Sequence, residues 1–204
     1  MELERLIDKY ISAGVATIGI DTVKWYFEYL LTISNLPIVS VGSGPGVVER
    51  ILDEAFAIDC ICVDPAPKSY INAPEAICKL PAYSFVQYLI DHKIGIVGKC
   101  CLLLNWSNPN DSTYDYDALV ALKPQFLIWI GETSGTAGGK KMLQWLKNCG
   151  IDMEVEDEIL VEYPTYNLIK EYHIDGYDNF AGWPTSTTIA ILQMSNVKQL
   201  LSII

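Results

Sequence analysis

A glycine-rich segment, GSGPG at residues 42–46, has the residue types best suited to ligand binding in this 204-residue chain. It follows a short, largely apolar run at 38–41 and precedes a segment at 47–55 whose apolar spacing predicts a helix. Glycines let a ligand approach the backbone closely, and the first turn of the helix offers free N–H groups at the positive end of its dipole. The pattern predicts a ligand-binding loop between a buried strand and a helix.

An acidic residue follows at a spacing that suits the same ligand. Residues 57–63 have the composition of a second strand that ends at Asp64 and Pro65, and Asp64 lies 22 positions after Gly42. A carboxylate about 20 residues beyond such a loop, at the end of the second strand, can accept hydrogen bonds from both hydroxyls of a ribose. The order of strand, glycine loop, helix, strand and acid predicts a nucleoside site, with a purely structural tight turn as the alternative.

The segments around this loop alternate between strand-like and helix-like patterns, which is typical of a doubly wound α/β fold. Further helices are expected at 84–93, 114–122 and 140–149, and further strands at 100–105, 126–130, 153–161 and 187–194. No helical period separates the last two strands. We therefore expect a mostly parallel sheet with helices on both faces and an antiparallel last strand, with a long loop at 163–184.

The first 35 residues have a different pattern from the rest of the chain. Apolar residues recur at helical spacing over 3–11 and again over 23–31, and no segment of linker composition follows them. We expect an N-terminal helical extension over 1–35 and an α/β domain over 36–204, which together form a single globular unit.

The form of the glycine loop separates the families that bind nucleosides. A dinucleotide loop reads GxGxxG and needs a glycine at the position of Val47. The GxGxG form resembles the first motif of class I S-adenosylmethionine-dependent methyltransferases. The turn at 122–124 (LKP) and the strand end at Asn105 and Trp106 are similar to later features of that family. The resemblance implies that 36–204 is a Rossmann-like methyltransferase domain.

The resemblance implies S-adenosylmethionine (SAM) as cofactor and direct displacement of its methyl group by a small-molecule or protein acceptor. The implied cofactor contacts are Ser40, Gly42, Ser43, Gly44, Pro45, Gly46, Asp64, Pro65 and Asn105. In the family, the glycine loop wraps the amino-acid and ribose part of the cofactor, and the acid at the position of Asp64 holds the ribose hydroxyls. Because displacement mainly requires alignment of the reacting atoms, no catalytic residue and no metal ligand is predicted.

Two segments hold candidate contacts to the methyl acceptor. Residues 105–109 loosely resemble the motif with which amino-methylating relatives hold a target nitrogen, so Trp106 and Asn108 are candidates. The alternative is a polar loop that caps the next helix.

The second segment is the aromatic-rich stretch at 163–184. Its candidates, Tyr166, His173 and Trp183, could wall a pocket or stack on the acceptor, and packing of the loop onto the protein is the alternative. A general-base role for His173 is conceivable because the unperturbed pKa of histidine is about 6.5.

One departure from the family keeps another interpretation open. The family carries an acid two positions before the first glycine, where this chain has Ser40, which supplies no charge. A catalytically inactive module that binds a partner is therefore the alternative to an enzyme. A nucleotide-cofactor oxidoreductase is less favoured because of Val47.

Composition argues against several other classes of protein. Acidic residues outnumber basic residues 25 to 14, which disfavours a nucleic-acid partner without excluding one, because such affinity rests on Lys and Arg. Neither a membrane helix of about 20 apolar residues nor a secretion signal is expected. The six cysteines lack zinc-site spacing, and we expect reduced thiols in the cytoplasm. Six acids at 152–162 are interpreted as the charged solvent face of the edge strand predicted at 153–161.

Overall fold

The computed structural model describes residues 28–33, 35–43, 46–63, 95–106, 113–134, 137–155, 158–161, 166–178 and 184–195, together with Arg5 and Trp25. The strands in these ranges are β1 (Ile38–Val41), β2 (Cys60–Val63), β3 (Cys101–Asn105), β4 (Phe126–Gly131), β5 (Tyr166–Asp178) and β6 (Pro184–Met194). The helices that accompany them are α3 (Val47–Phe56), α5 (Tyr114–Leu122) and α6 (Lys140–Asn148).

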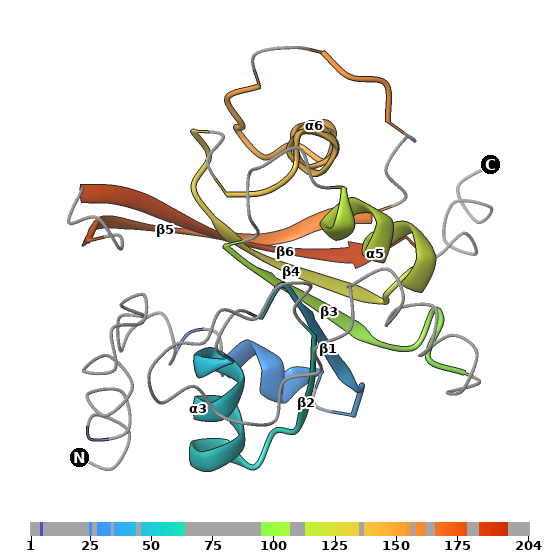
Figure 1. The fold of residues 1–204 in the computed structure, drawn as a ribbon, viewed down its shortest axis with the longest axis vertical. Helices are drawn as coiled ribbons and strands as arrows, with labels where there is room; N and C mark the ends of the chain where they lie inside the picture. Colours follow the sequence, from blue (N-terminus) through green and yellow to red (C-terminus); the bar gives the residue numbers. More distant parts are fainter. Residues whose placement is uncertain are drawn as a thin grey trace.

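The six strands form one sheet in the order β2-β1-β3-β4-β6-β5 (Figure 1). The pairs β1–β2, β1–β3 and β3–β4 are parallel, whereas β6 runs antiparallel to both β4 and β5. This arrangement confirms the predicted α/β class, the mostly parallel sheet and the antiparallel last strand. After β1 the chain adds β2 on one side and later adds β3 and β4 on the other, so the strand order reverses between β1 and β3.

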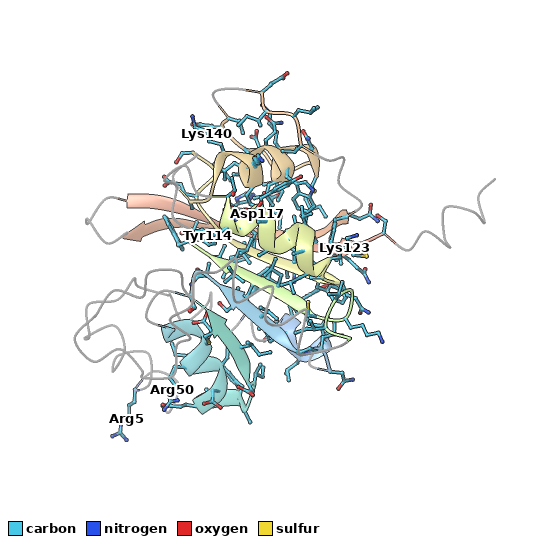
Figure 2. All side chains as sticks on the ribbon, turned by 45° about the vertical axis from the view of Figure 1, so that its right-hand side comes forward. Arg5, Arg50, Tyr114, Asp117, Lys123 and Lys140 are labelled. Atoms are coloured by element: carbon cyan, nitrogen blue, oxygen red, sulfur yellow. The ribbon has the colours of Figure 1, made fainter. Side chains whose placement is uncertain are left out.

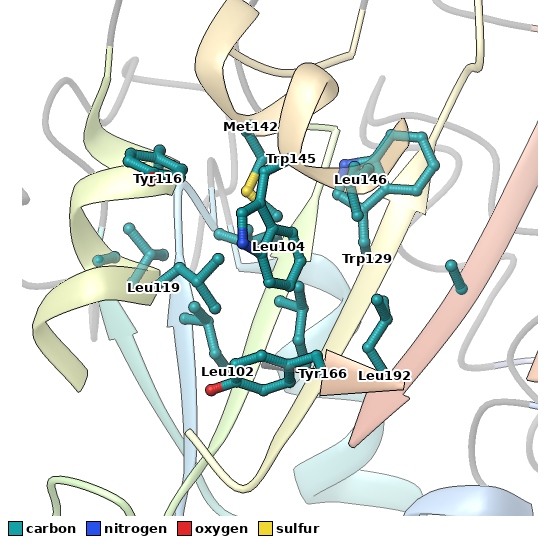
Figure 3. Packing of buried hydrophobic residues seen from close by; sticks show 14 of the residues in the cluster. Leu102, Leu104, Tyr116, Leu119, Trp129, Met142, Trp145, Leu146, Tyr166 and Leu192 are labelled. Atoms are coloured by element: carbon teal, nitrogen blue, oxygen red, sulfur yellow. The ribbon is translucent and has the colours of Figure 1, made fainter. Parts of the chain in front are cut away.

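Helices cover both faces of the sheet, as expected for parallel strands whose residues are apolar on both sides. One face packs against α5 and α6, and Figure 3 shows this cluster around Trp129, Trp145 and Leu104. The other face packs against Leu52 of α3 and against Leu30 and Ile33, which precede β1. Trp25 and residues 28–32 are helical, and most of the predicted helix at 3–11 lies outside the described residues.

The local sequence signals placed most of these elements correctly. Helix α5 has the predicted bounds, and α3, α6, β3 and β4 differ from their predicted bounds by one residue at one end. Helix α5 ends because Lys123 adopts a left-handed conformation (φ 45°) and donates its backbone N–H to the carbonyl oxygen of Leu119 at 3.0 Å. The following Pro124 cannot continue a helix. The predicted helix at 84–93 lies outside the described residues.

The strand predicted at 153–161 is wrong. The described parts of this segment are irregular, although Ile151 and Met153 are buried and Asp152 and Glu154 are exposed, as the alternating pattern indicated. The backbone N–H of Glu154 donates to the carbonyl oxygen of Thr133 at 2.8 Å rather than to a sheet partner. The described acids of this segment, Asp152, Glu154 and Glu158, therefore do not line an edge strand.

Besides β4, strand β6 pairs with β5. Strand β5 lies inside the segment that was predicted to be a loop at 163–184. Its pairing runs from Tyr166 opposite Met194 to Asp178 opposite Pro184, with register shifts after Leu168 and after Ile174. Each shift inserts residues that break the two-residue alternation, which is the signal that identifies a strand in a sequence. The long loop prediction is wrong for this reason.

Within the described residues, none of the helices has the length and apolar character needed to span a membrane.

Candidate functional site

The candidate site lies where the carboxyl ends of β1 and β3 meet. Ser40 of β1 is in register with Leu103 of β3, so the glycine loop after β1 and Asn105 at the end of β3 are at the same edge of the sheet. In open α/β sheets, ligands bind in the crevice outside the strand ends at the point where strand order reverses. We call this place, formed by the ends of β1 and β3 and the start of α3, the switch point (Figure 1).

The glycine loop has the backbone geometry that only glycine adopts readily. Gly42 has φ 74° and Gly46 has φ 69°, and both values lie in the left-handed region. Gly46 is also the N-cap of α3, and its N–H donates to the carbonyl oxygen of Ser43 at 2.9 Å. Strand, glycine loop and helix therefore follow one another in the predicted order. Gly44 and Pro45 lie outside the described residues.

Tyr114, the first residue of α5, lies against this loop (Figure 2). A methyl group added to Gly42 would lie 2.6 Å from the Tyr114 hydroxyl and 3.0 Å from its ring, so a side chain at position 42 would force Tyr114 to move. The contact joins the helix after β3 to the loop after β1. Sequence analysis missed Tyr114 because the two residues are 72 positions apart, and no local pattern links them.

A buried polar pair lies between β1 and α3. Ser40 is fully buried, Glu49 is 4% exposed, and the Ser40 hydroxyl donates a short hydrogen bond to Oε1 of Glu49. Burial first, and then the negative charge of Glu49, raise the pKa of the Cys60 and Cys62 thiols on β2. A carboxylate therefore lies beside the position where the sequence has only an uncharged hydroxyl.

Sequence analysis also missed Glu49. A signal for it existed, because Glu49 is three residues before the buried Leu52 and therefore shares its helical face. An acid on the apolar face of a short helix is rarely solvent-exposed, and its burial then needs a polar partner. Ser40 is that partner here.

Trp106 has a strained backbone directly after β3. Its φ of 49° is in the left-handed region, which is a genuine outlier for a bulky residue and costs on the order of 1–3 kcal/mol. Its N–H donates to the carbonyl oxygen of Ile130 at 2.8 Å, and its side chain packs against both core clusters. Such strain persists only where surrounding contacts hold it, and it concentrates at functional sites. Asn105, half-buried, immediately precedes it.

Tyr166 lies far from the switch point. It is paired with Met194 near the amino end of β4, and its hydroxyl donates to the carbonyl oxygen of Pro124 at 2.5 Å. Its ring packs edge-on against Trp145, with centroids 5.4 Å apart, and burial raises the pKa of its hydroxyl. These contacts tie β5 to the turn before β4.

His173 lies at the same edge of the sheet as the switch point but on β5. It is opposite Thr188, which is opposite Gly131 of β4, so it is three strand spacings, or about 14 Å, from β3. Its Nδ1 is 2.9 Å from the Thr188 hydroxyl oxygen, and its Nε2 is 3.5 Å from Oε1 of Glu171. The structure does not bring His173 next to Asn105.

Asp115 is a second buried carboxylate that sequence analysis missed. Its Oδ2 accepts a hydrogen bond from the N–H of Gly139, the N-cap of α6, at 2.7 Å, and its Oδ1 accepts one from the N–H of Tyr116 at 2.8 Å. Burial raises its pKa despite these hydrogen bonds. Asp115 thus joins the start of α5 to the start of α6.

Other predicted site residues, Asp64, Pro65, Asn108 and Trp183, lie outside the described residues. Within the part of the chain that is described, no group of three or more His, Cys, Asp or Glu side chains could hold a metal ion. The cysteines described there, Cys60, Cys62, Cys100, Cys101 and Cys149, are free thiols.

Comparison with known proteins adds a fold assignment. No protein-family model and no curated protein matches the sequence. Solved structures do match, among them the O-methyltransferase of Bacillus cereus in complex with S-adenosylhomocysteine (SAH), with 14% identity and a TM-score of 0.52 over 94% of this chain and 90% of that one.

Two further structures match over comparable lengths. A Klebsiella pneumoniae protein assigned as an O-methyltransferase has 11% identity and a TM-score of 0.52, covering 95% of this chain and 90% of that one. The O-methyltransferase TomG of Streptomyces achromogenes, solved in complex with SAM, has 12% identity and a TM-score of 0.50 over 95% and 89%. The chain therefore has the Rossmann-like fold of class I methyltransferases.

Proposed function

We propose that this chain binds SAM at the switch point and transfers its methyl group to a small-molecule or protein acceptor. The observation that carries the proposal is the adjacency of the glycine loop and Asn105-Trp106 at the ends of two neighbouring parallel strands. The fold supports it, because similar structures include methyltransferases in complex with SAM and SAH.

The described residues fit such a cofactor. Gly42 and Gly46 shape a loop that admits close approach of a ligand to the backbone, and the helix that follows begins directly at Gly46. When bound, the cofactor would supply a methyl group attached to a positively charged sulfur. Direct displacement would move the methyl group to the acceptor and leave SAH. The loop would hold the amino-acid and ribose part, and Asp64 would hold the ribose hydroxyls.

Asn105 and Trp106 would face the reacting end of the site. The strained backbone of Trp106 fixes the direction in which the chain leaves β3, and its packing against both clusters holds the indole in place. Positioning of this kind can supply about 7–11 kcal/mol of a displacement barrier without a catalytic acid or base. The acceptor would be aligned by such residues.

A thermal-shift series tests the proposal against its alternatives. We expect SAM and SAH to raise the melting temperature, because saturation at 100 times Kd stabilises the folded state by about 2.7 kcal/mol. Asp64→Ala should abolish that shift, and Asp59→Ala, which removes an exposed acid from the same segment, should retain it. Release of SAH in the presence of phenolic small molecules or peptides then identifies the class of acceptor.

Each alternative has its own outcome in the same series. If none of SAM, SAH, NAD and FAD shifts the melting temperature, the catalytically inactive module becomes the favoured interpretation. If NAD or FAD alone does so, it is a nucleotide-cofactor oxidoreductase.

A further inference from the structure

Strand β5 forms one edge of the sheet. It is last in the strand order, so within the described residues one side of its backbone pairs with β6 and the other side pairs with no strand. Side chains in the middle of β5 are open to solvent: Ile169 is 43% exposed, Tyr172 is 38% exposed, and the His173 side chain is 58% exposed. An uncovered edge presents backbone N–H and C=O groups to which another strand can add.

The regular part of this edge is short. The register shifts after Leu168 and after Ile174 enclose a stretch at 170–174 in which each residue lies opposite one residue of β6. Irregularities of this kind bend and twist a strand, so a further strand can add without interruption only along the stretch between them. The sequence of the stretch, KEYHI, contains no proline, which would remove a backbone donor.

Lys170 is the residue of this stretch best suited to block pairing, because a lysine charge at a sheet edge resists burial by another strand. Its Nζ lies 5.2 Å from the centroid of the Trp25 ring, and the same ring stacks on Tyr172 with centroids 5.4 Å apart. The ammonium group is thus held over the face of the sheet that Trp25 covers rather than beside the edge. The backbone of the stretch is left accessible to a further strand.

Glu171 and His173 lie on the opposite face of the stretch. Alternate residues of a strand share a face, and Nε2 of His173 lies 3.5 Å from Oε1 of Glu171. Nδ1 of His173 lies 2.9 Å from the Thr188 hydroxyl oxygen. When Nδ1 accepts the hydrogen of that hydroxyl, Nε2 carries the ring proton and can donate it to a carboxylate. The edge therefore presents a carboxylate and an imidazole donor side by side.

We propose that a second copy of this chain adds to β5 in antiparallel orientation, with the Tyr172 residues of the two copies opposite each other on a twofold axis. This register pairs the stretch 170–174 entirely with itself, because positions 170 and 174, and likewise 171 and 173, exchange across the axis. The contact is isologous, since the same patch of both subunits closes the dimer. Dimerisation of this kind is independent of methyl transfer.

Charge complementarity selects a second copy in this register. Residues directly opposite each other in an antiparallel pair share a face, with Cβ atoms about 4.5–5.5 Å apart. Glu171 of each copy is then opposite the partner's His173, so that carboxylates and imidazole donors alternate around the axis. A register centred on Lys170 or on Glu171 would instead place like charges opposite each other, which is destabilising. Because the regular stretch is short, the contact is small, and we expect a weak dimer that forms at high protein concentration.

Sedimentation equilibrium of the full chain over a wide concentration range measures the association. We expect a monomer–dimer equilibrium that Glu171→Lys weakens about tenfold or more, because symmetry puts the introduced lysine opposite a histidine twice. Asp59→Lys makes the same change of charge at an exposed position just before β2, the opposite edge of the sheet, and should leave the equilibrium unchanged. A wild type that stays monomeric, or equal effects of the two variants, would overturn the inference.

A mixing experiment separates a loss of charge complementarity from misfolding. His173→Glu alone should also weaken the dimer, because carboxylates then lie opposite each other. A mixture of the Glu171→Lys and His173→Glu variants should associate again, because the introduced lysine lies opposite the introduced glutamate and the remaining histidine lies opposite the remaining glutamate. A mixture that associates no more tightly than either variant alone would contradict the proposed pairing.

Oxidative cross-linking checks the register. Tyr172→Cys places two thiols opposite each other at the axis and should give a disulfide-linked dimer. Lys170→Cys places the thiols four residues out of register, about 14 Å apart, which is too far for a disulfide. It should therefore give no more cross-linked dimer than the wild type, whose own cysteines set the background. Cross-linking that is equal at the two positions, or stronger at position 170, would overturn the proposed register.

Discussion

The two halves of the sheet are built differently. The switch-point half has β1 and β2, each of four residues, and β3 of five, all parallel and separated in sequence by long crossovers. The hairpin half, formed by β4, β6 and β5, contains antiparallel strands of 11 and 13 residues that follow each other closely in the chain. The switch-point half thus pairs short strands that are far apart in sequence, whereas β5 and β6 are long strands that are close in sequence.

The switch-point half holds the buried Ser40–Glu49 pair, the left-handed Gly42 and Gly46 and the strained Trp106. In the described part of the hairpin half, the buried side chains on both faces of the sheet are mostly apolar, among them Trp129, Ala190 and Ile189. We infer that the hairpin half mainly supplies stability.

The largest expected effect is in the hairpin half. Trp129 is fully buried on β4 among the residues of Figure 3, and Trp129→Ala should lower the free energy of unfolding by about 3–5 kcal/mol. Urea denaturation measures the loss. Ile169→Ala, at an exposed position of β5, should change stability by less than about 0.5 kcal/mol. A loss below about 1 kcal/mol for Trp129→Ala would break the comparison.

The second effect concerns the glycine loop. Gly42→Ala should destabilise the protein by about 1–3 kcal/mol, because it adds a side chain at φ 74° and forces it against Tyr114. In a Tyr114→Ala background the same substitution should cost about 1 kcal/mol, because only the backbone strain remains. A double-mutant cycle in urea measures the coupling. Equal costs in the two backgrounds would show that Tyr114 does not restrict position 42.

The third effect concerns Asp115, which joins α5, the helix after β3, to α6, the helix after β4. Asp115→Asn replaces one acceptor oxygen with an amide group and should cost about 1 kcal/mol at low pH. The folded-state pKa of Asp115 is raised above its ordinary 3.8, because the fold favours the protonated carboxyl. The wild type therefore gains stability from this group at pH values below 3.8. That gain is lost as the pH rises through the raised value.

The deficit of Asp115→Asn should therefore shrink between pH 3 and pH 7, as measured by urea denaturation at each pH. A deficit that grows with pH would mean that the pKa of Asp115 is lowered on folding instead.

The smallest effect sharpens the boundary of the site. Because His173 is about 14 Å from β3, His173→Gln should change the Kd for SAM by less than twofold. Asn105→Ala, at the end of β3, should weaken SAM binding and serves as the positive control. A tenfold loss of affinity in His173→Gln would place the hairpin half in the cofactor site.

Local signals explain which elements could be predicted. The bounds of α5 follow from Lys123-Pro124 at its end, and β3 follows from the run CLLLN. Strand β5 is the longest of the described strands, yet it was missed. Its register shifts after Leu168 and Ile174 break the alternation of buried and exposed residues that would have identified it. At 151–155 the alternation is present but the strand is not. Buried and exposed residues also alternate along an irregular segment that packs on the core, so the pattern alone predicted a strand there.

The sequence by itself determined the strand, glycine loop and helix at 38–56 and the class of the fold, because these depend on backbone preferences and on periodicity within short segments. Only the tertiary structure decided that Tyr114 lies against Gly42, that Ser40 binds Glu49, and that β5 rather than 153–161 pairs with β6. These contacts depend on which surfaces the folded chain brings together. Side-chain packing across the sheet selects them, and no spacing within one segment encodes them.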